Sequence, residues 1–177
     1  MKFKLTAECK EFYGIKLFRI EALIDIPRWG VKAGDKGGWV EKEENLLQVS
    51  GDAWVSGNAR VYGNARVSGN AQVYGSARVY GNAQVYGDAQ VSGDARVSGD
   101  AQVSGNAQKT PIFITGLKYP ITITDAHMRI GCEFHTLAEW AVFDDERIAR
   151  MDGVASRNFW KAHRDTLLAI AKAEGRS

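Results

Sequence analysis

Hydrophobic and polar positions repeat every six residues from Val49 to Gln108, in the form Val-[Ser/Tyr]-Gly-[Asn/Asp/Ser]-Ala-Xaa. Because side chains alternate between the two faces of a strand, the Ala and Val of each segment share one face, and Xaa and Ser/Tyr share the other. The Gly-Asn and Gly-Asp pairs tolerate the backbone conformations of a tight corner. Each hexad therefore predicts one short strand and one corner. A single hexad cannot bury its own Val and Ala, so the pattern predicts the stacked coils of a solenoid.

The repeat has recognisable ends. Lys109 stands where the next valine would fall, and Pro111 follows it. A charge in the valine column and a proline both end a solenoid. Because the ends of a solenoid expose unpaired strand edges, we expect a cap on each side. The sequence thus predicts an N-terminal β cap at residues 1–48, the repeat region at 49–110 and a further domain at 111–177.

The flanking regions carry weaker signals than the repeat. Before it, residues 15–20 mix apolar and charged side chains of β character, and glycines between residues 30 and 38 indicate turns. After it, Thr136 and Glu139 form a capping-box pattern that begins a helix, and Gly153 ends that helix. The other elements predicted after the repeat are strands at 112–115, 121–124 and 128–130 and a second helix at 159–172. Together they indicate a small α+β domain.

An aliphatic residue followed four places later by a small one, as in Val55 and Ala59, resembles the hexapeptide-repeat family of left-handed parallel β-helices. The resemblance implies three hexads per triangular coil, about 3.3 coils, and assembly into trimers through flat faces. The implied fold class is mainly β: an N-terminal β cap, a left-handed parallel β-helix and a C-terminal α+β domain. Residues 121–132 and 151–160 also resemble the tails of phage and prophage hexapeptide proteins, which implies a phage origin.

Composition narrows the function classes. The 177 residues carry 23 basic and 21 acidic side chains, a formal net charge of +2. This balance argues against an acidic nucleic-acid mimic and against generic nucleic-acid binding. Cys9 and Cys132 lie far apart in the sequence, which favours free thiols in a reducing compartment. Neither a signal peptide nor a membrane span is evident, so we expect a cytoplasmic protein, in the host cell if phage-encoded, with no membrane partner.

The repeat lacks the groups that catalysis on this kind of fold requires. In the family that it resembles, acyltransferases use histidine as a general base and zinc carbonic anhydrases use it as a metal ligand. Residues 49–108 contain no His, Cys, Glu or Lys. After the repeat, His127, Cys132 and His135 are weak candidates for a metal site. Packing and surface roles are the simpler interpretation, and we expect no catalytic residue, metal or cofactor.

If three hexads make one coil, residues 18 apart stack on one face. One face then carries arginines in register with two tyrosines beside them, namely Arg60, Tyr62, Arg78, Tyr80 and Arg96. No acidic residue shares this row, and like charges at the spacing of neighbouring strands repel by about 1 kcal/mol in water. Three interpretations stay open: a solvated face, a subunit interface, and a site for an anionic ligand.

The other two faces carry aromatic side chains that indicate a secondary interface. Trp54 and Tyr74 lie on the second face and Tyr86 on the third. At the two ends of the repeat, the same register pairs Gln48 with Arg66 and Gln90 with Gln108.

The missing catalytic groups favour a non-enzymatic, phage-encoded binding protein that forms a homo-oligomer, with a trimer favoured. We expect it to bind or sequester a host protein or a small anionic, nucleotide-like ligand. Counteracting a host defence is the role that a phage origin favours. Two alternatives stay open: a structural phage component with the β-helix as a stiff rod, and an atypical acyltransferase-like enzyme using His127, Cys132 or His135.

Overall fold

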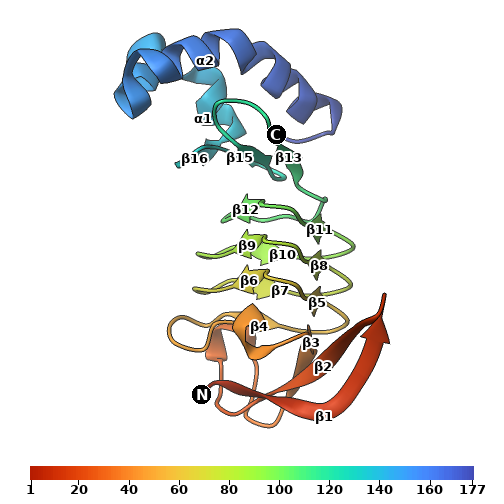
Figure 1. The fold of residues 1–177 in the computed structure, drawn as a ribbon. Coiled ribbons are helices and arrows are strands. Elements are labelled where there is room, and N and C mark those ends of the chain that lie inside the picture. Colours follow the sequence, from red (N-terminus) through yellow and green to blue (C-terminus); the bar gives the residue numbers. More distant parts are fainter. The chain divides into compact units, whose positions relative to one another are not determined.

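The computed structural model describes residues 1–177, which fold into two compact units, Met1–Pro111 and Ile112–Ser177. The first unit holds a β-solenoid with an N-terminal β cap, and the second holds an antiparallel sheet with helices (Figure 1). None of the helices combines the length and the apolar composition that a membrane crossing requires. The predicted architecture, mainly β with a solenoid and an α+β tail, is confirmed.

The N-terminal cap is a hairpin that continues one sheet of the solenoid. Strands β1 (Phe3–Phe12) and β2 (Ile15–Ala22) pair antiparallel, and β3 (Lys36–Val40) pairs with β2. Strand β3 then pairs in parallel with the first repeat strand of that face. The sheet order is β1-β2-β3-β5-β8-β11, so one continuous surface runs from the hairpin onto the coils.

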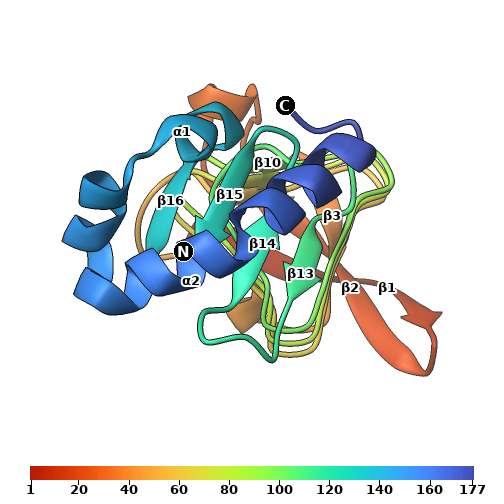
Figure 2. The same ribbon diagram turned by 90° about the horizontal axis from the view of Figure 1, so that it is seen from above.

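The repeat forms nine two-residue strands that stack into three parallel sheets. They are β4 (Trp54–Val55), β5 (Arg60–Val61), β6 (Arg66–Val67), β7 (Gln72–Val73), β8 (Arg78–Val79), β9 (Gln84–Val85), β10 (Gln90–Val91), β11 (Arg96–Val97) and β12 (Gln102–Val103). Each strand from β4 to β9 pairs with the strand 18 residues later, for example Arg60 with Arg78. This register confirms three hexads per coil, and the coils follow nearly the same outline when seen from above (Figure 2).

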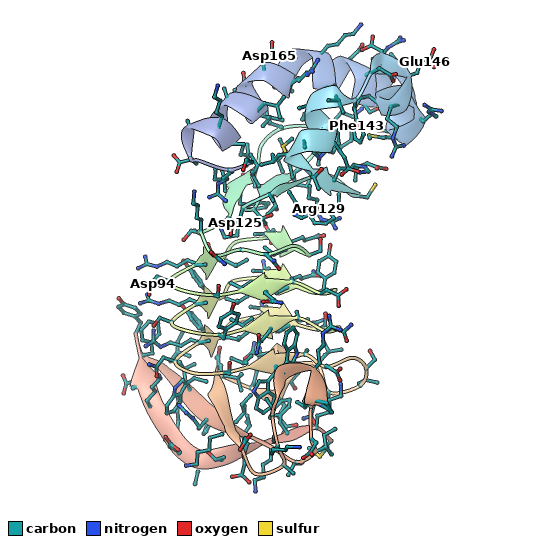
Figure 3. All side chains as sticks on the ribbon, turned by 180° about the vertical axis from the view of Figure 1, so that it is seen from behind. Asp94, Asp125, Arg129, Phe143, Glu146 and Asp165 are labelled. Carbon is teal, nitrogen blue, oxygen red and sulfur yellow. The ribbon has the colours of Figure 1, made fainter.

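The inner columns of the coils are the predicted valines and alanines. Every repeat valine from Val55 to Val103 is fully buried, and no alanine from Ala53 to Ala107 is more than 2% exposed. The corners are held by backbone bonds between coils, such as the amide of Asn82 donating to the carbonyl of Gly99 at 2.9 Å. Corner side chains such as Asp94 lie at the outer edge of the coils (Figure 3). The solenoid interior is therefore a column of small aliphatic side chains.

The first hexad does not follow the predicted register. Val49 is 88% exposed, and Leu46 takes its place in the core, 1% exposed and bridged to Val67. Leu46 directly follows the 3₁₀ turn η2 (Glu43–Asn45). The side-chain amide of Asn45 donates to the carbonyls of Gly63 and Ala65, which fixes this turn against the coil and places Leu46 in the core. The expected inward position of Val49 was therefore wrong, since local hydrogen bonds decide which residue enters the coil.

The expected pairing of Gln48 with Arg66 was also wrong. The side-chain oxygen of Gln48 instead accepts a hydrogen bond from the backbone amide of Lys2 at 2.9 Å. It lies at 3.5 Å from the amide of Phe3 as well. Gln48 thus ties the beginning of β1 to the base of the solenoid.

At the other end, the register shifts after β12. The repeat register would pair Val91 with Lys109, but Val91 pairs with Ala107 instead. The carbonyl of Ala107 accepts a hydrogen bond from the amide of Ser92 at 3.2 Å. The expected pairing of Gln90 with Gln108 was wrong for this reason. The hydroxyl of Thr110 accepts from the backbone amide of Arg96 at 3.1 Å, which satisfies a strand amide where the repeat ends.

The second unit is an antiparallel meander followed by helices. The strands are β13 (Ile112–Ile114), β14 (Ile121–Ile123), β15 (His127–Ile130) and β16 (Glu133–Thr136), and the helices are α1 (Leu137–Val142) and α2 (Asp145–Ala173). The first three strands were predicted, whereas β16 was not. The 3.6-residue pattern of the sequence begins only after it, so nothing local marked residues 133–136 as a strand.

The helices break where single residues provide caps. The predicted helix from Thr136 to Gly153 divides at Asp144, whose carboxylate accepts from the amide of Arg147 at 2.7 Å and begins α2. Helix α2 is itself interrupted at Asp152 and Gly153, where Gly153 has a φ of 59°. The prediction of one uninterrupted helix up to Gly153 was wrong, because the N-cap at Asp144 competes with helix continuation.

Candidate functional site: a basic and aromatic face on the solenoid

A single row of residues crosses five strands of the hairpin–solenoid sheet. Arg19 on β2 pairs with Trp39 on β3, which pairs with Arg60 on β5. Arg60 pairs with Arg78 on β8, and Arg78 pairs with Arg96 on β11. We call these five residues the basic row. Since the valine next to each repeat arginine points into the core, alternation along each strand directs the arginines outward.

The tip of the hairpin covers part of this row. The Phe12 ring lies 4.4 Å from the guanidinium carbon of Arg60 and 5.1 Å from that of Arg78. The same ring meets the Tyr62 ring edge-on at 5.9 Å between centroids. Aromatic faces attract cations, so Phe12 orients two guanidinium groups without neutralising them. The hairpin turn carries Tyr13, which is 83% exposed beside the row.

Two tyrosines flank the arginines in register. The Tyr62 and Tyr80 rings stack with centroids 5.2 Å apart and planes 5° from parallel. Burial raises the pKa of Tyr62, as does Tyr80, while Arg78 and Arg60 act in the opposite direction. The Tyr62 hydroxyl therefore remains a protonated donor near neutral pH, next to the guanidinium groups.

A lysine from the hairpin joins the same face. The ammonium nitrogen of Lys10 lies 3.9 Å from the centroid of the Trp39 ring, and the guanidinium of Arg19 lies 5.0 Å from that ring. Burial lowers the pKa of Lys10 to about 8, with further lowering by Arg60 and Arg19. Lys10, Arg19 and Arg60 therefore lie close enough to repel one another.

None of the cations of this face, namely Lys10, Arg19, Arg60, Arg78 and Arg96, forms an ion pair with a carboxylate. The only hydrogen bond of these side chains is a long one, 3.5 Å from Arg19 to the carbonyl of Gly57. The Nε of Arg60 is buried and has no hydrogen-bond partner. The guanidinium and ammonium groups of this face therefore offer positive charge and hydrogen-bond donors to a bound anion.

Of the predicted secondary interface, one residue is not available to a partner. Trp54 is 1% exposed, and its ring packs close to Gly37 of the cap. Its burial follows from the cap, which covers the first coil. Tyr74 and Tyr86 are half-buried beside β7 and β9, on two different sheets. The secondary face therefore offers these two tyrosines separately and not as one patch.

The residues proposed as weak metal candidates are not gathered around one point. The His127 ring stacks on Phe134 at 4.9 Å, and the Nε2 of His135 lies 3.0 Å from a carboxylate oxygen of Glu133. Cys132 is exposed at the turn between β15 and β16. No three His, Cys, Asp or Glu side chains form a group that could hold a metal ion.

Sequence reasoning missed four members of the basic and aromatic face: Lys10, Phe12, Arg19 and Trp39. Their segments carry no periodic signal that links them to the repeat. It also missed a cavity of about 210 Å³ in the second unit, lined by Tyr119, Ile130, Gly131, Cys132, Glu133, Trp140, Ile148, Met151, Asp152, Ser156, Phe159 and Trp160. The aromatic residues at helical spacing predicted a core there, but spacing alone does not reveal a cavity that opens beside it.

Comparison with known families supports the repeat and leaves the remainder of the chain unmatched. The YdcK beta solenoid repeat family is similar to this chain over residues 59–75, 71–87 and 89–105. All three segments lie within the coils, so the similarity concerns the repeat alone. Curated proteins give no match. The similarity supports a β-solenoid for these segments of the repeat and assigns no chemistry to them.

Proposed function

We propose that the protein is a non-enzymatic binding protein whose basic row holds an anionic, nucleotide-like ligand. The observation that carries this proposal is the in-register row Arg60, Arg78 and Arg96, none of which forms an ion pair with a carboxylate. Guanidinium groups bind phosphates and carboxylates through paired hydrogen bonds. The rings of Phe12 and Tyr62 beside them provide surfaces for an aromatic base.

The arginines along the row repel one another. Neighbouring strands lie about 4.8 Å apart, and two unit charges at that distance repel by about 1 kcal/mol in water and by several kcal/mol at lower dielectric. The Phe12 ring packs on Arg60, and the Trp39 ring of the row packs on Lys10 and Arg19, so apolar surface adjoins these cations. A ligand with several negative charges would relieve the repulsion of several pairs at once.

The test is a titration with labelled adenosine triphosphate and with inorganic tripolyphosphate, followed by fluorescence anisotropy or calorimetry. The triple variant Arg60→Gln, Arg78→Gln, Arg96→Gln should weaken binding at least about tenfold, since each charged hydrogen bond contributes about 1.5–3 kcal/mol. The matched control replaces Arg66, Arg150 and Arg157 by Gln, which changes the net charge equally but leaves the row intact. Equal binding by both variants would refute the site. Preference for the nucleotide over tripolyphosphate would indicate that the rings contact the base.

The same proposal includes self-association and a cellular role. We propose a homo-oligomer, with a trimer favoured, built through the flat sheets of the coils. Light scattering over a range of protein concentrations tests this, and a monomer at every concentration would contradict it. The proposed role, as a phage protein in the host cytoplasm that sequesters a host protein or signalling ligand, is tested by capture from infected cells with mass spectrometry of proteins and small molecules.

A further inference from the structure

Lys10 presents an accessible amine in a cationic and aromatic setting. It lies on β1, the edge strand of the hairpin–solenoid sheet (Figure 1). Its nitrogen lies 3.9 Å from the centroid of the Trp39 ring and forms no ion pair. The Nε atoms of Arg19 and Arg60 are buried, whereas the half-buried Lys10 keeps its nitrogen open to solvent. Glu11, the next residue, points to the opposite face because side chains alternate along a strand.

Two guanidinium groups act on this amine from neighbouring strands. Burial lowers the pKa of Lys10 to about 8, and Arg60 on β5 and Arg19 on β2 lower it further in the same direction. Glu8, on the same strand, is held at 2.7 Å by Lys36 and does not pair with Lys10. At pH 7.5 about a quarter of the Lys10 side chains are therefore uncharged, against about 0.1% for an ordinary lysine. An uncharged amine is a nucleophile, whereas an ammonium group is not.

The surroundings of Lys10 favour an electrophile that leaves a negative charge on the nitrogen. A neutral acyl group would only remove one positive charge from the face. Carbon dioxide replaces the positive charge by a negative one, so the repulsion from Arg60 and Arg19 becomes attraction. Carbon dioxide is uncharged before it reacts, and the Trp39 ring provides apolar surface beside the amine. It adds a single carboxyl group, so the reaction needs no enclosed cavity.

We propose that Lys10 is a carbamate-forming site, at which carbon dioxide adds reversibly to the side-chain amine and the guanidinium groups of Arg60 and Arg19 stabilise the product. The lone pair of the neutral nitrogen forms a bond to the carbon of carbon dioxide. The electron pair of one carbon–oxygen double bond moves to its oxygen, and one proton leaves the nitrogen to water. The inference does not rest on the proposed function, because the carbamate forms and is detected without a nucleotide.

The experiment detects the carbamate on the full chain at pH 7.5. The protein is equilibrated with isotope-labelled bicarbonate in a closed tube, and the carbamate carbon is observed by NMR. Trapping with triethyloxonium and peptide mass spectrometry assign its position. Lys10 should be modified saturably as carbon dioxide increases. Lys16 is the matched comparison, since it lies on the same hairpin with its nitrogen 5.2 Å from the Phe18 ring, but is exposed. It should be modified at least about tenfold less, in line with the small uncharged fraction of an ordinary lysine.

Three variants separate the amine from its cationic neighbours. Lys10→Arg keeps the positive charge and removes the amine, so the Lys10 signal alone should disappear. Arg60→Gln should lower the equilibrium constant for the carbamate, expressed per uncharged amine from a pH series, about two- to fivefold, as for the loss of an exposed ion pair. The control Arg66→Gln lies on a different sheet and should leave that constant unchanged.

The α-amino group of the chain also reacts with carbon dioxide, and its carbamate confirms that the conditions suffice. Absence of a Lys10 carbamate while the α-amino group reacts would overturn the proposal. Equal modification of Lys10 and Lys16 would overturn it too, since the setting of Lys10 would then have no effect. An unchanged constant in Arg60→Gln would show that the guanidinium groups do not stabilise the product, which the proposal requires.

Discussion

Replacing Gly81 by alanine should destabilise the solenoid because two separate costs add at this corner. Gly81 has a φ of 71°, in the left-handed region that residues with a Cβ atom avoid. A Cβ built on Gly81 would also lie 3.1 Å from the backbone nitrogen of Gly99 and 3.3 Å from its carbonyl oxygen. Corner glycines of successive coils stack directly on each other, so backbone and not a flexible side chain opposes the added methyl.

A second corner in the same unit isolates the first cost. Gly87 has nearly the same φ of 64° and follows a tyrosine, as Gly81 does, but a Cβ there would meet nothing closer than Ser104 at 3.9 Å. The left-handed conformation costs an alanine about 1–2 kcal/mol. Contact of a carbon at 3.1 Å lies well inside the optimum of about 3.5–4.0 Å, and such overpacking costs about 1–3 kcal/mol more. We therefore expect about 2–5 kcal/mol for Gly81→Ala and about 1–2 kcal/mol for Gly87→Ala.

The assay is urea unfolding followed by far-ultraviolet circular dichroism, with deuterium exchange of peptides from the coils. The peptide measurement is needed because two units and a repeat array need not unfold in one transition. Deuterium exchange in the coil peptides should accelerate more in the Gly81→Ala variant than in the Gly87→Ala variant. Equal destabilisation by the two variants would refute the reasoning, since it would mean that stacking between corners contributes nothing beyond the left-handed backbone.

The remaining predictions follow from burial and charge. Val79→Ala should lower the free energy of unfolding by about 1.5–3 kcal/mol because Val79 is fully buried, whereas Val49→Ala, at an 88% exposed position, should change it by less than about 0.5 kcal/mol. Thermal unfolding measures both effects. Similar effects of the two variants would contradict the observation that Val49 lies outside the first coil. Burial, with Arg60 and Arg19, lowers the pKa of Lys10 to about 8, so the unfolded chain binds more protons above that pH and stability should increase from about pH 8 to about pH 10.5. Arg60→Gln should raise the pKa of Lys10, measured by carbon NMR of the lysine side chains, and an unchanged titration would disprove the proximity of the two cations.

Part of the candidate site was predictable because it lies on the repeat. The row Arg60, Arg78 and Arg96 and the stacked Tyr62 and Tyr80 were placed together by the eighteen-residue register alone. The same reasoning failed at both ends of the repeat. There, hydrogen bonds of individual side chains, from Asn45 at the start and from the backbone of Arg96 to Thr110 at the finish, replace the periodic contacts that set the register within the coils.

The six-residue period by itself determined the solenoid, its buried aliphatic column and the face on which each repeat side chain lies, because every hexad repeats one set of backbone angles. Only the tertiary structure decided that Phe12 and Lys10 fold onto the arginines, that Leu46 replaces Val49 in the first coil, and that Trp160 lines a surface cavity. Those contacts join residues that are distant in sequence or different in kind. Local periodicity carries no information about them, since they depend on how separate, non-repeating segments pack against each other.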